Sequence, residues 1–141
     1  MNKPLVFFNA SVIIAGILSP KGGSAKVIGW VKRGKIHGII SEIIFNEVLK
    51  NADKINKSEE VVANDILKFK FLIVKAPNKL DAKFEKIALD PGDIHVLTSA
   101  LQSKVKYLIS LDAKHILSLS NKVKDFKIVT PGQLIKEINK S

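Results

Sequence analysis

Asn9, Glu47, Asp93 and Asp112 are the residues in this chain whose types and positions could do chemistry together. Carboxylate and amide oxygens are the ligands that hard cations such as Mg²⁺ and Mn²⁺ prefer. The chain has no cysteine, which excludes disulfides, thiolate metal sites and cysteine nucleophiles. Its three histidines show no ligand spacing to one another. Any metal must therefore be held by oxygen or imidazole ligands, and hard cations such as Mg²⁺ or Mn²⁺ come first.

Short apolar runs alternate with segments of helical length, and these elements must position the four residues. The runs are typical of strands buried on both faces of a parallel sheet, and they lie at residues 5–8, 38–40, 71–74, 107–110 and 126–129. The predicted helices are residues 24–32, 41–51, 58–69, 93–104 and 131–138. Alternating strands and helices predict a mostly parallel sheet covered on both faces, in a single α/β domain over residues 1–141.

The predicted elements bring the candidate residues toward one edge of the sheet. Ligands of open parallel sheets bind beyond the carboxyl ends of the strands. Asn9 follows the first strand directly, and Asp112 closely follows the strand at 107–110. Asp93 lies on the buried stripe of its helix, and Glu47 lies at the margin of an apolar face. Since an unpaired buried charge is costly, we expect these side chains to have partners at that edge.

Each candidate also has an interpretation that involves no chemistry. The helix dipole favours an acid such as Asp93 in the first turn of a helix. Asp112 could cap a short helix over residues 113–119, and Glu47 could be a solvated helix residue. Asn9 could be an ordinary turn residue at the end of a strand. Taken one by one, the residues leave both interpretations open.

The charge of the chain favours a polyanionic partner. There are 23 basic and 13 acidic residues, a formal net charge of +10, and Arg33 is the only arginine. A compositional bias toward lysine would give the same charge, so both explanations stay open. No apolar stretch of about 18 residues could cross a bilayer, and Asn9 interrupts the apolar run at 5–8 before it resembles a signal peptide. We therefore expect a cytoplasmic protein without a membrane partner.

Nucleotide-binding fingerprints are absent. The most loop-like segment, PKGGS at residues 20–24, lacks the spacing of a phosphate-binding P-loop and does not directly follow the first strand. A Rossmann glycine fingerprint is absent as well.

Four segments together resemble the motifs of the PIN domain family, in the right order and spacing. They are VFFNASVIIAG (6–16), EIIFNEVLKN (42–51), DPGDIHVLTSAL (90–101) and YLISLDAKHIL (107–117). The first and the last two are fairly specific, and the resemblance extends from residue 5 to about 130. The family contains many prokaryotic toxin–antitoxin ribonucleases of the VapC kind. The resemblance implies a three-layer α/β/α fold and RNA hydrolysis with Mg²⁺ or Mn²⁺ held by acidic residues.

The resemblance also implies roles for individual residues. By position, the family's catalytic and metal-binding acids correspond to Glu47, Asp93 and Asp112. Asn9 stands where the family usually has aspartate. Asparagine still offers a neutral carbonyl oxygen, but it supplies no charge and cannot act as a base. We therefore expect weakened or lost activity in a chain that keeps the fold.

Three further positions complete the comparison with the family pattern. Ser11 stands where the family often has asparagine or serine, and Ser110 takes the place of the small hydroxyl residue before the third acid. We expect Ser110 to hold a ligand or phosphate oxygen by a hydrogen bond. Lys114 occupies a place where many members carry another acid, which also favours reduced activity.

Two alternatives to an active ribonuclease remain open. The first is an inactive PIN-like domain that binds RNA or protein, which Asn9 and Lys114 favour. The second is a doubly wound response-regulator or small-molecule-binding domain. The absence of an acidic pair after the first strand argues against it. If the chain is a toxin, the resemblance implies an antitoxin that fills the acidic pocket, and a second copy of the chain is another open partner.

Overall fold

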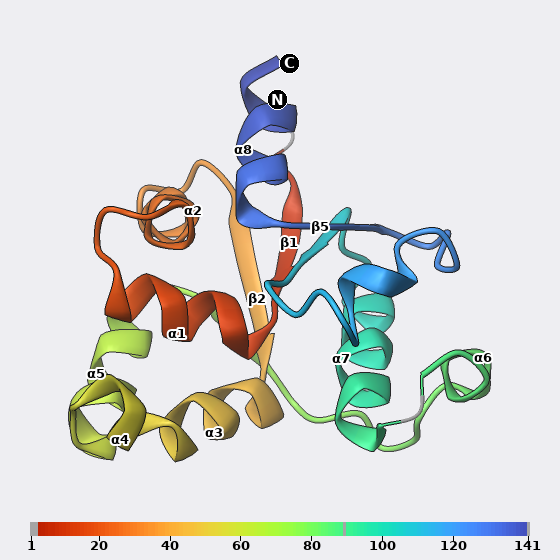
Figure 1. Ribbon diagram of the computed structural model, residues 1–141, viewed down its shortest axis with the longest axis horizontal. Helices are drawn as coiled ribbons and strands as arrows, with labels where there is room; N and C mark the ends of the chain where they lie inside the picture. Colours follow the sequence, from red (N-terminus) through yellow and green to blue (C-terminus); the bar gives the residue numbers. More distant parts are fainter. Residues whose placement is uncertain (1–2, 89, 141) are drawn as a thin grey trace.

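Five parallel strands form the centre of the molecule. The computed structural model describes residues 3–88 and 90–140. Within this part of the chain the strand order is β3-β2-β1-β4-β5, and every pairing is parallel (Figure 1). The strands are β1 (Leu5–Phe8), β2 (His37–Ser41), β3 (Leu72–Val74), β4 (Tyr107–Ile109) and β5 (Lys127–Val129). All five predicted strands are confirmed, with shifts of one residue at their ends.

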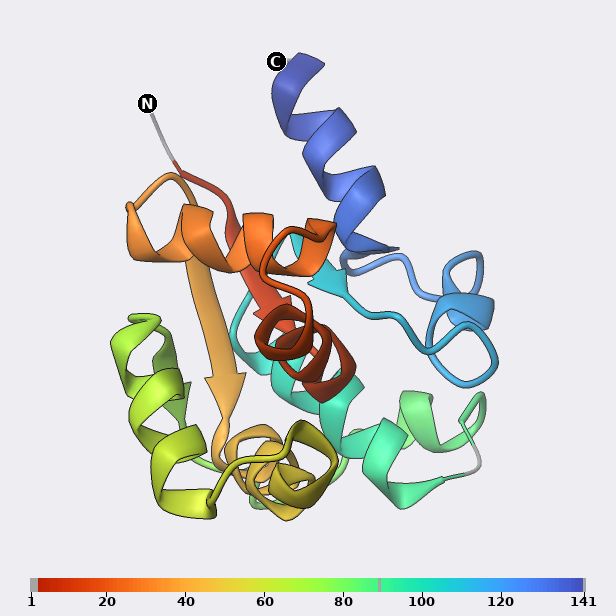
Figure 2. The ribbon, with the colours of Figure 1, turned by 60° about the vertical axis from the view of Figure 1, so that its left-hand side comes forward.

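Helices cover both faces of the sheet. They are α1 (Ala10–Leu18), α2 (Gly23–Lys32), α3 (Glu42–Lys50), α4 (Ala52–Ile55), α5 (Glu59–Lys68), α6 (Ala82–Glu85), α7 (Pro91–Gln102) and α8 (Pro131–Lys140), with a 3-10 turn, η1 (Leu117–Leu119). Figure 2 shows α1 and α2 in front of the sheet and α7 behind it, so the expected three-layer α/β/α fold is confirmed. No helix in the described ranges is long and apolar enough to cross a membrane.

Side-chain caps fix where the predicted helices begin. The hydroxyl of Ser41 accepts a hydrogen bond from the backbone N–H of Ile44 and starts α3. Asp90 caps α7 by accepting from the N–H of Gly92, and a proline occupies the first helical position. α7 therefore begins at residue 91, two residues before the predicted start.

Helix α1 was not predicted from the sequence. Its nine residues, ASVIIAGIL, are apolar almost all round, so they show no amphipathic stripe. The helix forms because it packs between neighbours. A Cβ atom at Gly16 would overlap the side chain of Ile28, which shows how closely α1 and α2 approach. Helix α6 also went unpredicted, because four residues are too few to show a period.

The strands differ in burial. Phe7 on β1 and Leu108 on β4 are fully buried, as predicted for strands covered on both faces. The same expectation is wrong for β3, where Leu72 is 61% and Ile73 is 37% exposed. The reason is that β3 lies at the edge of the sheet, beside β2 only.

The strand order places a switch in direction at the centre of the sheet. From β1 the chain builds outward through β2 to β3, then returns to add β4 and β5 on the other side of β1. The crevice beyond the carboxyl ends of β1 and β4 is therefore where an open sheet of this kind binds ligands.

Candidate active site

Asn9 links the ends of β1 and β4. Its side-chain Nδ2 donates a hydrogen bond to the hydroxyl oxygen of Ser110 at 2.8 Å, and its Oδ1 accepts from the N–H of Ala10 at 2.9 Å. Both residues are buried, with Asn9 8% and Ser110 0% exposed. Asn9 is thus the N-cap of α1 as well as the bridge between the two strand ends.

The loop that carries Asp112 is held by two serine hydroxyls. The Oγ atom of Ser110 accepts from the N–H of Asp112 at 3.0 Å, and the Oγ atom of Ser11 accepts from the N–H of Leu111 at 3.0 Å. Since Ser110 is fully buried, both of its hydrogen bonds join parts of the protein. The serines therefore position the loop, which is a different role from the ligand contact expected for Ser110.

Asp112 caps a turn and also contacts a histidine. Its Oδ1 accepts from the N–H of His115 at 3.0 Å, and its Oδ2 lies 3.3 Å from Nδ1 of the same residue. The predicted helix over residues 113–119 is wrong, because residues 113–116 form turns and only η1 is helical.

Glu47 and Asp93 are brought into one electrostatic environment. Partial burial of its carboxyl group raises the pKa of Glu47, and the charges of Asp93, Asp90 and Asp112 raise it further. The pKa of Asp93 is raised first by burial and then by Asp90 and Asp112. Much of Glu47 is exposed, but the negative charges of the other acids still affect the pKa of its carboxylate. The structure brings the three candidate acids together, and Asn9 joins them through Ser110.

Four different elements supply these side chains. Glu47 comes from α3, Asp93 from the first turn of α7, Asp112 from the loop after β4, and Asn9 from the end of β1. Figure 1 shows α3 and the start of α7 at the edge toward which the strands run. We call this the carboxyl edge of the sheet.

Two neighbours of the acids were missed in the sequence. Asp90 and His115 were not among the candidate residues named from the sequence. Both affect the pKa of Asp93, Asp90 by raising it and His115 by lowering it. Each lies three residues from a candidate acid, and this spacing is the signal that could have found them.

The donor atoms fit a hydrated divalent cation better than a fully enclosed one. Within residues 3–88 and 90–140, no group of three or more His, Cys, Asp or Glu side chains is arranged to hold a metal ion. Mg²⁺ usually keeps several waters and binds through one or two carboxylates. Glu47, Asp93 and Asp112 offer oxygen ligands of the kind that such an ion uses.

Comparison with known proteins identifies the fold. VapBC2 from Rickettsia felis, solved with a DNA fragment from its promoter, matches with a TM-score of 0.60 and 12% identity, over 88% of this chain and 96% of that one. VapBC-1 from nontypeable Haemophilus influenzae matches with a TM-score of 0.59 and 15% identity, over 91% and 98%. PAE2754 from Pyrobaculum aerophilum matches with a TM-score of 0.57 and 18% identity, over 94% and 88%.

The sequence itself gives the more specific match. No curated protein sequence matches the chain. The family model for the PIN domain, however, matches residues 5–114, and β5 extends the same sheet beyond that range by pairing with β4. The resemblance seen in the four sequence segments is thereby confirmed, and the chain belongs to the PIN domain family, whose members are generally ribonucleases.

Proposed function

We propose that this chain is a metal-dependent endoribonuclease of the PIN type whose activity is weakened by Asn9. One observation carries the proposal: the buried Asn9 at the end of β1 is joined through Ser110 to the loop of Asp112, and Asp112 lies close enough to Glu47 and Asp93 to help raise their pKa values. Holding acids of like charge close together destabilises a fold, so such a group indicates a bound partner whose charge offsets the repulsion. A divalent cation with an RNA phosphate is the partner that fits a basic protein of this family.

The residues at the edge would divide the work. Asp93, Asp112 and Glu47 would hold a hydrated Mg²⁺ or Mn²⁺ ion, directly or through water. Bound there, the cation supplies positive charge for the phosphate and helps to activate water for attack on phosphorus. Ser11 and Ser110 would keep the Asp112 loop in place.

Asn9 limits this site because both ends of its amide are engaged within the protein. Its Oδ1 accepts from Ala10 and its Nδ2 donates to Ser110. Aspartate has nearly the same shape but no hydrogen to donate, so the hydroxyl of Ser110 would have to donate to it instead. A serine hydroxyl can do so while still accepting from Asp112. The exchange therefore adds a negative charge with little change in packing.

Asn9→Asp should raise both divalent-metal affinity and RNA cleavage. The experiment is metal titration by calorimetry, paired with cleavage of a mixed RNA substrate in Mg²⁺ and in Mn²⁺. Asn121→Asp adds the same charge at an exposed turn and is the matched control. Equal metal affinity in the unaltered chain and in the Asn9→Asp variant, with no cleavage by either, would mean that the carboxyl edge is not a nuclease centre.

The same substitution should destabilise the metal-free fold. A fourth carboxylate adds negative charge near Glu47 and Asp93, whose pKa values are already raised by burial and by neighbouring acids, so we expect the free energy of unfolding to fall by about 1–2 kcal/mol. Urea unfolding in a chelator measures this. The part of the loss that comes from repulsion by the partly exposed acids should shrink at high salt, whereas the cost of burying the new charge at position 9 should remain. Stability and activity would then move in opposite directions.

A second candidate function is an inactive binding module in the same family. The engagement of both amide ends of Asn9 within the fold favours it, because the residue is then a structural cap. Cleavage by the unaltered chain in Mn²⁺, against a metal-free control, separates the two candidates.

The likeness to VapBC structures supports a partner as well. In this extension of the proposal, the chain is the toxin of a toxin–antitoxin pair that acts on RNA in the cytoplasm. An antitoxin segment would cover the carboxyl edge. Expression of the Asn9→Asp variant with and without the protein encoded by the adjacent gene tests it, with growth arrest expected only without that partner.

A further inference from the structure

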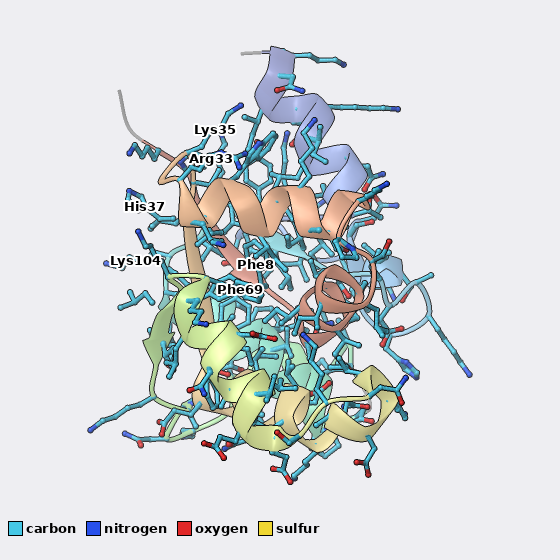
Figure 3. All side chains as sticks on the ribbon, turned by 90° about the vertical axis from the view of Figure 1, so that its left-hand side faces the viewer. Phe8, Arg33, Lys35, His37, Phe69 and Lys104 are labelled. Atoms are coloured by element: carbon cyan, nitrogen blue, oxygen red, sulfur yellow. The ribbon has the colours of Figure 1, made fainter. Side chains whose placement is uncertain are left out.

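The opposite edge of the sheet, where the strands begin, gathers basic side chains. Because all the described strands are parallel, the segments that lead into them meet at this amino edge. Backbone hydrogen bonds join these segments, from His37 N to Pro4 O at 3.0 Å and from Lys106 N to Leu5 O at 2.9 Å. We call six exposed residues there the amino-edge cations: Lys3, Arg33, Lys35, Lys70, Lys104 and Lys106. Figure 3 shows Arg33, Lys35 and Lys104 along one side of the molecule.

These cations are not neutralised by acids. Residues 3–8, 31–38, 66–71 and 101–107 contain no aspartate or glutamate. Within the described ranges, none of the six forms an ion pair. Two acids reach this side of the molecule. Glu137 pairs with Lys127 at 3.0 Å, and the nearby charge of Lys106 also helps to lower its pKa, while Asp125 pairs with Lys83 at 2.8 Å. The edge therefore keeps an unbalanced positive charge.

Two of the cations occupy backbone positions that suit glycine. Lys70 follows α5 with a φ of 69°, and Lys104 follows α7 with a φ of 54°. The equivalent position after α2 is Gly34, with a φ of 76°. Left-handed backbone is strained for lysine and free for glycine, so the lysine side chains are retained at a conformational cost. Attraction to the negative end of each helix is one explanation, and contact with a polyanion is another.

A hollow beside these cations distinguishes the two explanations. It has a volume of about 340 Å³, and its lining includes the aliphatic residues Val31 and Leu72 as well as His37 and Lys70. Helix dipoles require no such space. An unpaired base could pack against the aliphatic side chains of the hollow while the adjoining phosphates contact the cations. The bases of a duplex are stacked inside the double helix and could not make this contact.

We infer that the amino edge is a second contact surface for single-stranded RNA, separate from the carboxyl edge. The inference rests on the proposed ribonuclease function and adds a substrate contact to it. The strands are short, so at about 3.3 Å per residue the two edges lie roughly 15 Å apart, within reach of one RNA strand. The amino edge binds backbone phosphates of the RNA strand, and the carboxyl edge cleaves the same strand.

The test removes the two strained lysines. Lys70→Gly/Lys104→Gly deletes two cations at positions where glycine fits the backbone better. Binding of a fluorescently labelled single-stranded RNA is measured across salt concentrations in EDTA, so the result does not depend on metal or cleavage. Losing two phosphate contacts should lower the salt slope by about 1.4 and weaken binding about 25-fold at about 0.1 M salt. The free energy of unfolding should not fall.

Two matched variants complete the experiment. Asn56→Gly relaxes another left-handed residue, with a φ of 59°, without removing charge, and it should leave RNA binding unchanged. Lys70→Arg/Lys104→Arg keeps the charge and should keep the binding. Two results would overturn the inference: RNA affinity that is unchanged in the double glycine variant, or a loss of stability without a loss of RNA affinity. Either result would mean that the lysines serve to stabilise the C-terminal ends of their helices. Equally tight binding of duplex DNA would overturn the assignment to single strands.

Discussion

At the carboxyl edge of the sheet, burial and neighbouring acids raise the pKa values of Glu47 on α3 and Asp93 on α7, whereas at the amino edge none of the six amino-edge cations forms an ion pair within the described residues. No short stretch of the sequence displays either group as a cluster. The parallel topology assembles both, because strand ends meet at one edge and strand beginnings at the other. Charge segregation in this protein is thus a product of the fold.

Helix dipoles support the same division. Helices α1, α3 and α8 follow strands, so their positive N-terminal ends face the carboxyl edge, where acids are favoured. Helices α2 and α5 precede strands, so their negative C-terminal ends face the amino edge, where cations are favoured. The dipoles lower the cost of each cluster, but they do not remove the repulsion within it.

The largest expected difference between the edges is in catalysis. Asp93→Asn or Asp112→Asn, made in the Asn9→Asp background where activity should be highest, should reduce RNA cleavage at least about 100-fold. The amides keep the shapes of the acids, so the fold should persist. Glu60→Gln on the exposed surface of α5 is the control and should leave cleavage unchanged. RNA cleavage that persists in both the Asp93→Asn and the Asp112→Asn variants would show that the carboxyl edge does not differ from the amino edge in catalysis.

A smaller effect is expected in the dependence of stability on pH. The folded-state pKa values of Glu47 and Asp93 lie above their ordinary values of 4.5 and 3.8. As the pH rises above these values the unfolded chain releases its protons first, so the folded protein holds more protons and stability falls with rising pH. The metal-free protein should therefore be more stable near about pH 5 than near about pH 7, by at most about 1 kcal/mol after solvent screening.

The variant Glu47→Gln/Asp93→Asn isolates this effect. Urea unfolding at both pH values, in a chelator, should show that the part of the pH dependence due to these acids has gone. Histidines titrate in the same range. Because His115 interacts with Asp93, His115→Gln is added to both proteins, and the other histidines contribute equally to each. An identical pH dependence in the two proteins would show that the acids of the carboxyl edge do not repel one another.

The smallest effect is expected from a single substitution at the amino edge, Glu137→Gln. Glu137→Gln breaks the exposed pair with Lys127 and should cost less than about 1 kcal/mol of stability. It also frees one more cation, so RNA affinity in EDTA should rise slightly. Asp65→Asn breaks the comparable Lys57 pair elsewhere and should cost as little without changing RNA affinity. A fall in RNA affinity with Glu137→Gln would contradict a role for this edge in binding phosphates.

Local patterns sufficed to predict most of the fold. The apolar strands and the capped, amphipathic helices α3, α5 and α7 were visible in the sequence because hydrophobic period and capping residues agreed. Helix α1 was not visible, since its apolar surface is explained only by what packs around it. The exposure of β3 depends on its position at the sheet edge, which no local pattern encodes.

The candidate site was predictable where strand ends define it. Asn9 and Asp112 follow strands, so their placement at the carboxyl edge could be anticipated, and helix phase was sufficient for Asp93. The contact of His115 with Asp112 depends on a turn where a helix had been expected. The amino-edge cations were counted in the net charge, but their gathering required the strand order.

The two serine hydroxyls that hold the Asp112 loop have a thermodynamic consequence. Ser11 and Ser110 bond the backbone N–H groups of Leu111 and Asp112 without any bound ion. Ordering a loop residue costs roughly 1–2 kcal/mol of conformational entropy, and here that loss occurs during folding. An ion arriving at the carboxyl edge therefore meets an acid that is already oriented. Its binding relieves the repulsion among the acids, and none of its binding free energy is lost in ordering this loop.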